Sequence, residues 1–514
     1  MASLGTLLFF LQCQAIFVFS GFFAAWHWAA WRRRVGLRRI ERRGTSRTPY
    51  CVDFDRDATR DDADVHLGTR SRRPRHPKVA VVCPVKRFGG ETARNWRTQM
   101  TSEYGGDLEY VFVAEREADS AVAGFAALMR DMQNEGKVEA EKNGELGAPG
   151  TSHVLCRKKK TNTLDAFVGA RRARLLVAGS STSCSQKIHS MLHGALASDE
   201  DTTFVLFLDD DIRTHRNTIG VLVRSMTTAL NVKNSKKTPF LTNGFPMDLP
   251  SRSSPFANYL TFVYHLVLLI AFSQGEVAKN VWGGCMMLRR ESLAKDAYGL
   301  VTAYKHGGYS DDLILASACD EHDEIVGCPH EAVFPQRLDE TQTLRQWWNY
   351  LRRQLFVMDT YANEWNRNVN HGMLFVLTYL SLATTVALVL CGAHLFLFVA
   401  ARVFFFTDEN ALDVQPPTLS LTLSFATFFC FALALSAARR MYHDTGKLVA
   451  ALGDADAFEK VLFIDWKKVA LAFFATYAVV PLAAVATLAS REVEWAGIRY
   501  VKKNGKVTRL ESER

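Results

Sequence analysis

The chain has 514 residues, enough for one large domain with membrane segments or for two to three ordinary domains. Its formal net charge is +9, but no motif of the usual nucleic-acid-binding modules occurs, so nucleic acid is not an expected partner. The basic residues lie mainly beside apolar stretches, as on the cytosolic flank of a membrane protein. The ten cysteines show no C-x-x-C pair or zinc spacing, which favours reduced thiols in a cytosol-facing domain.

The first apolar stretch, residues 4–31, contains no charged residue and is long enough to cross a bilayer, which needs about 20 apolar residues. It is longer than the core of a signal peptide and no basic region precedes it, so residues 1–31 are expected to be a retained anchor. Seven arginines follow between residues 32 and 43. The positive-inside rule places these arginines in the cytosol and Met1 in the lumen.

Residues 78–365 have the pattern of an α/β domain. Three short apolar runs, at residues 78–84, 108–114 and 203–208, are separated by helix-length polar stretches, which favours a parallel, doubly wound sheet. Ligands of such sheets bind beyond the carboxyl ends of the strands.

Three other segments lie in or beside this domain. Residues 32–77 are expected to be a basic cytosolic linker, and residues 135–163 a surface insertion, because both are polar and without periodicity. Residues 256–274 are apolar but flanked by motif-like sequence. They are interpreted as a core or membrane-surface helix rather than a span.

The C-terminal part, residues 366–490, returns to the membrane in about three apolar stretches, at 373–406, 418–438 and 469–490. The first is too long for one span and short for two, and fits one span plus an interfacial helix. Simple alternation places the basic tail, residues 491–514, in the lumen, whereas its lysines favour the cytosol. Whether the number of crossings is odd or even stays open, because one segment could lie in the interface instead of crossing.

The strongest sign of chemistry is the run Asp209-Asp210-Asp211, directly after the third apolar strand. Carboxylates at a strand end repel one another, so the arrangement is unfavourable unless a cation neutralises them. A hard divalent ion, bridging them to a diphosphate, is the natural occupant. A solvated turn with acidic caps is the alternative, which the apolar strand in front of the run disfavours.

Two further motifs contain glycines. Asp311 and Asp312 follow residues 307–310 (GGYS) and precede a helical run, so we expect them at a helix N-terminus. They could cap the helix, or one of them could take the proton of an attacking hydroxyl. In Trp282-Gly283-Gly284 the glycines allow close backbone approach to a ligand, although a tight turn into a strand explains them equally well.

Aromatic and basic residues alternate at residues 345–354 (RQWWNYLRRQ), just before the membrane region. They could form an interface belt, or they could bind a diphosphate leaving group and cover the acceptor. The residues expected in the second role are Gln346, Trp347, Trp348, Tyr350, Arg352 and Arg353.

Six motifs together resemble those of the ceramide glucosyltransferases, particularly the plant and algal type, in the correct order. They are NWRTQMTSEYGG (95–106), STSCSQKIH (181–189), VLFLDDDIRTHRNTIG (205–220), VWGGCMM (281–287), GGYSDDL (307–313) and WWNYLRRQ (347–354). The tail VEWAGIRYVKKNGKV (493–507) is similar to the short closing segment of that family. The resemblance covers most of residues 78–365.

This resemblance implies a GT-A fold of the glycosyltransferase family 2 type: an α/β domain with a Rossmann-like mixed sheet between N-terminal and C-terminal transmembrane helices. It implies inverting transfer of glucose from UDP-glucose to the primary hydroxyl of ceramide, giving glucosylceramide and UDP, with Mg²⁺ or Mn²⁺ as cofactor. The expected enzyme is an integral membrane protein of the Golgi or endoplasmic reticulum, with its catalytic domain facing the cytosol. No protein partner is identifiable.

The resemblance also assigns roles to single residues. Asp209 and Asp211 match the metal and diphosphate carboxylates, and Asp312, with Asp311 beside it, matches the catalytic base. The residues expected near the nucleotide sugar are Glu115, Asp119, Lys187, Asp210, Gly283 and Gly284. The family's (Q/R)-x-x-R-W motif departs here to Gln346-Trp347-Trp348-Asn349-Tyr350, so Arg352 or Arg353 is expected to supply the missing cation.

Other functions stay open. A related membrane glycosyltransferase with another lipid or a polysaccharide acceptor would normally carry a clear Q-x-x-R-W, and a polysaccharide synthase more spans. A non-catalytic membrane scaffold is a second alternative, which metal-dependent UDP binding would exclude. A transporter would need a charged residue inside the apolar spans, where only Arg402 lies near one end.

Overall fold

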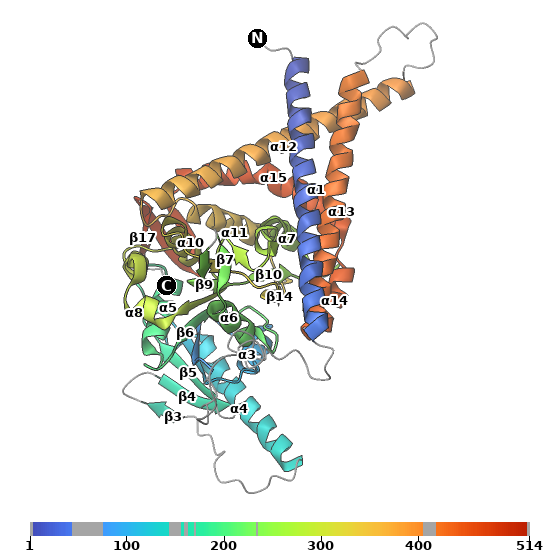
Figure 1. The fold of residues 1–514 in the computed structure, drawn as a ribbon. Helices are drawn as coiled ribbons and strands as arrows, with labels where there is room; N and C mark the ends of the chain where they lie inside the picture. Colours follow the sequence, from blue (N-terminus) through green and yellow to red (C-terminus); the bar gives the residue numbers. More distant parts are fainter. Residues whose placement is uncertain are drawn as a thin grey trace.

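The computed structural model describes residues 4–43, 76–142, 156–158, 163–168, 171–232, 235–404 and 418–510. Residues 44–75 of the predicted linker 32–77 and the centre of the expected insertion 135–163 lie outside these residues. Where they are described, the prediction is corrected: residues 32–43 continue the N-terminal helix, and residues 135–142 continue the helix that begins at Ser120. Figure 1 shows an α/β domain beside a group of long helices that come from both ends of the chain.

A ten-stranded mixed sheet forms the centre of the α/β domain. Its strands, in spatial order, are β11 (Val277–Ala278), β13 (Val326–Gly327), β9 (Leu241–Asn243), β12 (Cys285–Arg289), β6 (Phe204–Leu208), β1 (Val79–Val85), β2 (Leu108–Ala114), β5 (Arg171–Val177), β4 (Thr163–Val168) and β3 (Cys156–Lys158). The central strands β6, β1, β2 and β5 are parallel, and antiparallel strands flank them. The three predicted apolar runs are β6, β1 and β2, within one residue at each end.

Both faces of the central strands are covered, which explains why these strands are apolar without alternation. On β1, Val81 and Cys83 pack against one set of helices, whereas Val82 points to the other face and packs against α5. The helices of this domain are α3 (Thr92–Met100), α4 (Ser120–Lys142), α5 (Gln186–Ala197), α6 (Thr218–Thr227), α8 (Arg290–Ala294), α9 (Leu300–Lys305) and α10 (Asp311–Glu321). Two small sheets, β7 (Leu230–Val232) with β8 (Ser235–Lys237) and β10 (Phe245–Asp248) with β14 (Val333–Gln336), complete it.

Among the described residues, four helices are long and apolar enough to cross a membrane, as expected of a membrane protein. They are α1 (Leu4–Arg43), α12 (Glu364–Phe404), α13 (Thr418–Ala451) and α15 (Trp466–Ala489). α1 and α13 lie side by side, and α12 crosses them (Figure 1). The long apolar stretch that begins at residue 373 therefore belongs to one continuous helix, α12.

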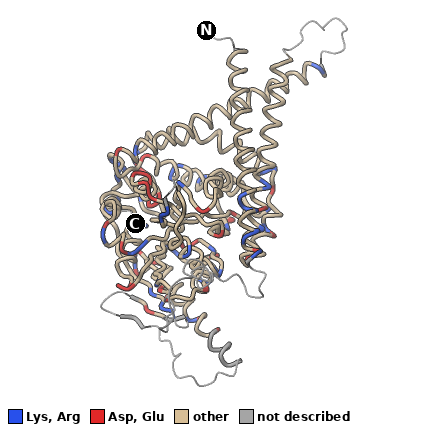
Figure 2. The backbone as a smooth tube through the Cα atoms, in the orientation of Figure 1, with Lys and Arg blue, Asp and Glu red and all other residues tan. Residues whose placement is uncertain are grey.

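The basic ends of α1 and α13 lie on the side of the α/β domain, where Figure 2 shows their charged residues. Arg34 Nε is 3.2 Å from Asp444 Oδ2, which joins the two helices. The buried Arg33 donates hydrogen bonds to the carbonyl oxygens of His330 (3.1 Å) and Phe272 (3.0 Å). The charged half of α1 is thus fastened to the α/β domain.

Shorter elements connect the domain to the long helices. They are α7 (Phe256–Leu268), α11 (Leu344–Val357) and α14 (Ala455–Leu462). α7 has 13 residues, too few to span a bilayer, and Tyr259, Phe262 and Val263 on it are fully buried. Residues 256–274, interpreted as a core or membrane-surface helix rather than a span, therefore contain a helix too short to cross, which ends at Leu268 and is largely buried.

The C-terminal tail folds into a three-stranded antiparallel sheet, β15 (Glu492–Trp495), β16 (Ile498–Lys503) and β17 (Lys506–Leu510). Asn504 and Gly505, with φ of 52° and 74°, form the turn between the last two strands. Tyr500 and Val507 pack with Tyr309 and Phe356 in a separate apolar core. The tail therefore returns to the α/β domain.

Candidate active site

The strand end predicted to hold the acidic run is rigid. Every residue of β6 is buried, and β12 places Cys285 opposite Leu208, so that Gly284 lies beside Asp209. The amide of Asp209 donates to the carbonyl oxygen of Gly284 (2.9 Å), and Gln99 donates to the carbonyl oxygen of Asp209 (2.9 Å). The glycine motif and the acidic run, 72 residues apart at their nearest members Asp211 and Gly283, therefore meet.

Lys187 links the two acidic motifs. Its Nζ lies 2.9 Å from Asp209 Oδ1 and 3.1 Å from Asp311 Oδ2, and it donates to the carbonyl oxygen of Gly283 at 3.1 Å. Burial alone would lower the pKa of Lys187, but the charges of Asp209 and Asp311 outweigh burial and raise this pKa. Lys187 is therefore a charged bridge between strand β6 and helix α10.

The start of α10 positions the acidic pair. Ser310 caps the helix: its Oγ accepts from the amide of Leu313 (3.3 Å) and donates to Asp312. Asp312 also accepts from the amides of Leu313 (2.8 Å) and Gly283 (3.3 Å). Asp311 is buried and bound to Lys187; burial raises its pKa to about 7, although Lys187 acts in the opposite direction. The two neighbouring acids thus have different environments.

Gly283 is required by this packing. A Cβ atom at this position would lie 2.8 Å from Asp311 Oδ2, and the backbone of Gly283 already bonds to both Asp312 and Lys187. The turn before β12 therefore brings the backbone of Gly283 onto the acids, and the approach of a ligand to this backbone stays a prediction.

The other two acids of the run have hydrogen-bond partners of their own. Asp210 accepts from the amide of Lys86 (3.4 Å), and burial, together with the charges of Asp211 and Asp209, raises its pKa well above the ordinary value. Gln336 donates to Asp211 Oδ2 at 2.7 Å; burial and the charge of Asp209 raise the pKa of Asp211 to about 6. Within the described residues, no three His, Cys, Asp or Glu side chains are grouped closely enough to hold a metal by themselves.

Glu115 and Asp119, predicted near the nucleotide, differ in their partners. Glu115 is buried and accepts from Arg509 Nη2 (2.6 Å) and Ser180 Oγ (2.8 Å), and these bonds lower its pKa even though burial raises it. Asp119 accepts from the amides of Arg87 (2.8 Å) and Ala121 (2.9 Å), so it orders the turn before α4.

The residues of the aromatic and basic motif, on helix α11, have different surroundings. Gln346 forms a capping box with Thr343, and Trp347 is buried among the apolar helices. Trp348 packs against the edge of the same apolar core. Tyr350 is hydrogen-bonded to His265 Nε2 at 2.8 Å.

The two arginines of this motif differ in what their side chains contact. Arg352 donates to the backbone carbonyl of Glu492 (3.4 Å), in the C-terminal sheet. Arg353 lines the cavity described below, and its guanidinium lies 5.0 Å from the ring centre of Trp495 and 5.5 Å from that of Tyr350. Of the two arginines left open by the sequence, Arg353 lines this cavity and Arg352 does not.

A cavity of about 510 Å³ opens between these elements. The predicted site residues that line it are Lys187, Asp209, Gly283, Gly284, Asp311, Asp312 and Arg353. The predicted residues outside its lining are Glu115, Asp119, Asp210, Asp211, Gln346, Trp347, Trp348, Tyr350 and Arg352. The cavity also extends to Trp365, Val369 and Met373, on the first turns of the apolar helix α12.

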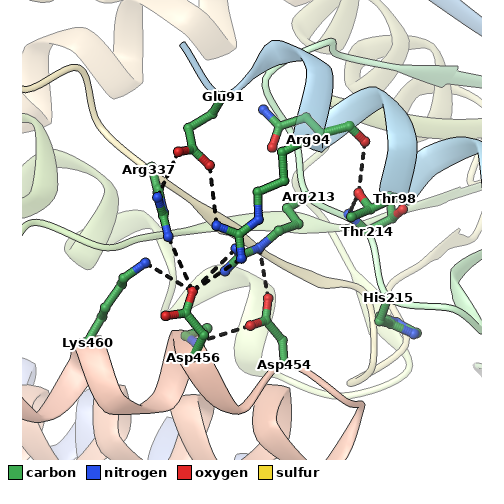
Figure 3. Close-up of polar contacts among 12 residues, drawn as sticks. Glu91, Arg94, Thr98, Arg213, Thr214, His215, Arg337, Asp454, Asp456 and Lys460 are labelled. Atoms are coloured by element: carbon green, nitrogen blue, oxygen red, sulfur yellow. Dashed lines mark hydrogen bonds and ion pairs between the residues drawn. The ribbon is translucent and has the colours of Figure 1, made fainter. Parts of the chain in front are cut away.

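A second charged cluster holds the loop after the acidic run (Figure 3). Arg213 Nε lies 2.8 Å from Asp454 Oδ2, between α13 and α14. Asp456, on α14, is 3.3 Å from Arg337 Nη2 and 3.0 Å from Lys460 Nζ. Although burial raises it, Lys460, Arg213 and Arg337 together lower the pKa of Asp456 to about 2. This cluster ties the acidic strand end to the long helices.

Sequence reasoning missed Arg509, Gln336 and Trp495 as parts of this region. Arg509 and Trp495 come from the C-terminal sheet, and Gln336 from the end of β14. The only available signal was the resemblance of the tail to a family segment, which assigned no role to single residues.

No family model and no curated protein matches the chain. Among solved structures, a mannosyltransferase from Pyrobaculum calidifontis in complex with GDP-Man and Mn²⁺ is similar at 14% identity and TM-score 0.36, over 82% of this chain and 99% of that chain. S. aureus TarS 1–349 is similar at 11% identity and TM-score 0.29, over 84% and 99%. Glucosyl-3-phosphoglycerate synthase from Mycobacterium tuberculosis, in complex with Mn²⁺, UDP and phosphoglyceric acid, is similar at 11% and 0.27, over 54% and 78%.

At these scores the likeness carries no argument about the reaction. The predicted fold class, an α/β domain with a mixed sheet and apolar helices towards both ends of the chain, is confirmed by the strand order and the helices themselves.

Proposed function

We propose that the chain is a membrane-bound GT-A glycosyltransferase that transfers glucose from UDP-glucose to the primary hydroxyl of ceramide, with inversion at the sugar. One observation carries the proposal. A single cavity is lined by Asp209 at the end of β6 and by Asp311 and Asp312 at the start of α10, and it continues along the apolar start of α12.

The donor end of the cavity fits a divalent cation and a diphosphate. Asp209, which lines the cavity, and Asp211, which lies just outside its lining, would hold Mg²⁺ or Mn²⁺, because carboxylate oxygens are the hard ligands these ions prefer and a cation offsets the repulsion between neighbouring acids. Since the described acids form no complete metal cage, phosphate oxygens and water would complete the coordination. When bound, the ion would neutralise charge on the departing UDP.

The cationic side chains that line the cavity are Lys187, Lys279 and Arg353, and Lys187 is the one bonded to the acids. We assign Lys187 to the sugar or diphosphate side, because it touches Asp209 and Gly283. Arg353 enters from α11 on the other side and can pair with a phosphate oxygen. It replaces the arginine that the family motif carries at Asn349.

Asp312 is the proposed base. Three donors, Ser310 and the amides of Leu313 and Gly283, hold its carboxylate at the cavity wall, whereas Asp311 is buried and bound to Lys187. Asp312 takes the proton of the acceptor hydroxyl as its oxygen forms the bond to the anomeric carbon. The bond from that carbon to the diphosphate oxygen breaks in the same step, so the centre inverts.

The apolar end of the cavity fits a lipid acceptor. A second cavity of about 490 Å³ shares Val369 and Met373 with the first and is lined further by Phe22, Val267 and Tyr477, among other apolar residues. Its walls come from α1, α7, α12 and α15, the membrane-side helices. The acyl chains of ceramide, which are unfavourable in water, would lie there with the hydroxyl reaching Asp312.

The decisive experiment uses the full chain in lipid nanodiscs, labelled UDP-glucose, a divalent metal and a panel of acceptors. We expect label in glucosylceramide and a loss of ~10²–10⁴-fold in turnover for Asp312→Asn. Asp201→Asn, which changes an exposed acid paired with Lys78, serves as the control and should leave turnover unchanged. Wild-type turnover of Asp312→Asn would disprove its role, and label only in a dolichyl or polysaccharide acceptor would disprove the ceramide assignment.

A further inference from the structure

The start of helix α15 is held on the α/β domain. Tyr259, on α7, accepts a hydrogen bond from the amide of Asp465 (3.3 Å). Two residues into the helix, Lys468 donates to the carbonyl oxygen of Arg252 at 2.7 Å. The preceding Asp454 pairs with Arg213, next to the acidic strand end. The chain therefore enters α15 from the side of the membrane that carries the active site.

The end of α15 is held on the same domain. Lys502 of the following sheet contacts both Asp359 and the carbonyl oxygen of Thr487, in the last turn of α15. Tyr500 OH accepts from the amide of Gln186 (3.0 Å), on the helix that carries the bridging lysine. Arg509 reaches Glu115, which is buried beneath the sheet. The chain therefore leaves α15 on the side from which it entered.

A helix as long as α15 cannot cross the bilayer and still have both of its ends on the same domain. α15 has 24 residues, which corresponds to about 36 Å at 1.5 Å per residue. The hydrocarbon core is about 30 Å thick. If α15 crossed it, one end would emerge on the far side, where it could not contact a water-soluble domain that both ends touch.

The surface of α15 nevertheless requires an apolar solvent. Leu471, Leu482, Val485 and Leu488 form an exposed stripe, with side chains between 53% and 66% exposed. After Lys468 the helix contains no charged residue. The opposite face, with Phe473 and Val480, packs into the core formed with α7, α11 and α12. A stripe of this kind on a helix that does not cross is typical of a helix lying in one leaflet.

We infer that α15 lies in the plane of the leaflet next to the α/β domain, with its exposed stripe in the acyl chains of that leaflet, and that only α1, α12 and α13 cross the bilayer. The basic end of α1, the basic end of α13 and the lysine-rich tail then all lie on one side, as the positive-inside rule requires. With three crossings the basic tail no longer has to lie in the lumen, so simple alternation and the lysines of the tail agree. The N- and C-termini then lie on opposite sides of the bilayer.

The number of crossings is tested with the full chain in sealed microsomes, carrying one epitope ahead of α1 and a different one at the C-terminus. Protease is added from outside while a lumenal marker stays intact. Three crossings protect one epitope and leave the other digested, which is the expected result. If both epitopes are protected or both are digested, an even number of helices crosses and the inference is wrong.

The leaflet contact needs a separate measurement. Benzoylphenylalanine in place of Leu482 should crosslink to phospholipid on illumination in nanodiscs. The same group in place of Leu196, which is 71% exposed on α5 of the α/β domain, is the matched control and should give no lipid adduct. An absence of lipid adduct at Leu482 would show that α15 does not lie in the leaflet, whatever the epitopes show.

Discussion

Two groups of charged residues in this protein differ in how completely they are neutralised. In the acid site, the carboxylates outnumber the cations that touch them: Lys187 meets Asp209 and Asp311, while the charges of Asp210, Asp211 and Asp312 lie close by. The pKa of Asp311 is raised to about 7. The site therefore lacks positive charge, and a cation or a proton is favourable there.

In the ionic cluster of Figure 3 the balance is reversed. The cations Arg94, Arg213, Arg337 and Lys460 surround the acids Glu91, Asp454 and Asp456. Here the pKa of Asp456 is lowered to about 2. Similar residue types thus serve two purposes. A deficit of cations marks a place where a ligand is expected, whereas a saturated cluster marks a place where two parts of the chain are fastened.

The largest effect is expected from Lys187→Met in the acid site. The substitution leaves the buried Asp311 and the half-buried Asp209 without their shared cation, and loss of one partner of a buried pair costs about 3–5 kcal/mol. The thermal midpoint and the folded yield in detergent should both fall, and added divalent metal should recover part of the midpoint. Lys295→Met, in an exposed pair with Glu291, is the control without measurable effect. An unchanged midpoint for Lys187→Met would show that the acids do not depend on this bridge.

A smaller loss is expected from Arg213→Met in the ionic cluster. The side chain of Arg213 is buried, but Asp454 keeps some access to water, so we expect a cost of about 1–3 kcal/mol in unfolding free energy. Because the cluster fastens and does not bind substrate, KM for the sugar donor should stay unchanged. A raised KM with unchanged stability would remove the distinction between the two groups.

The two groups also predict different responses to pH. The ordinary pKa of Asp311 is 3.8 and its folded pKa is about 7, so between these values the folded state holds a proton that the unfolded state has lost. Stability should therefore fall as pH rises from about 4 to 7. In EDTA, the thermal midpoint of Asp311→Asn should depend less on pH in this interval than the wild type. Above about pH 5, Asp456→Asn should not alter the dependence, because Asp456, with an ordinary pKa of 3.8 and a folded pKa of about 2, is ionised there in both states.

The smallest effect is expected from Arg94→Gln. Arg94 and its partners Glu91 and Asp456 are between 37% and 46% exposed, and exposed ion pairs contribute about 0.2–1 kcal/mol. Chemical denaturation should show a change within this range that shrinks at high salt. A loss larger than that of Arg213→Met would show that the exposed ion pairs of Arg94 contribute more to the stability than the buried Arg213 does.

Local features of the fold were predictable from the sequence. β1, β2 and β6 were predicted within one residue because strands buried on both faces are continuous apolar runs, and that signal needs no knowledge of neighbours. The position of Asp311 and Asp312 at a helix start followed in the same way from the glycines before them and the helical run after them.

Long-range features were not predictable. The two acidic motifs are 100 residues apart at their nearest members, Asp211 and Asp311, and the sheet and α5 bring both motifs into contact with Lys187. Arg352 and Arg353 both contact β15, and only the packing of α11 against the other elements decides that Arg353 is the one that lines the cavity. The contact of Arg509 with Glu115 joins residues 394 apart.

The sequence alone determined that this protein has apolar helices long enough for a membrane, an α/β domain between them, and acids at one strand end, because periodicity and apolar length act over a few neighbouring residues. Only the tertiary structure decided which acids share Lys187, which arginine enters the cavity, and that α15 begins and ends on the same domain. These depend on contacts between distant segments, and the free energy of such contacts is set by the assembled core and not by any one stretch of chain.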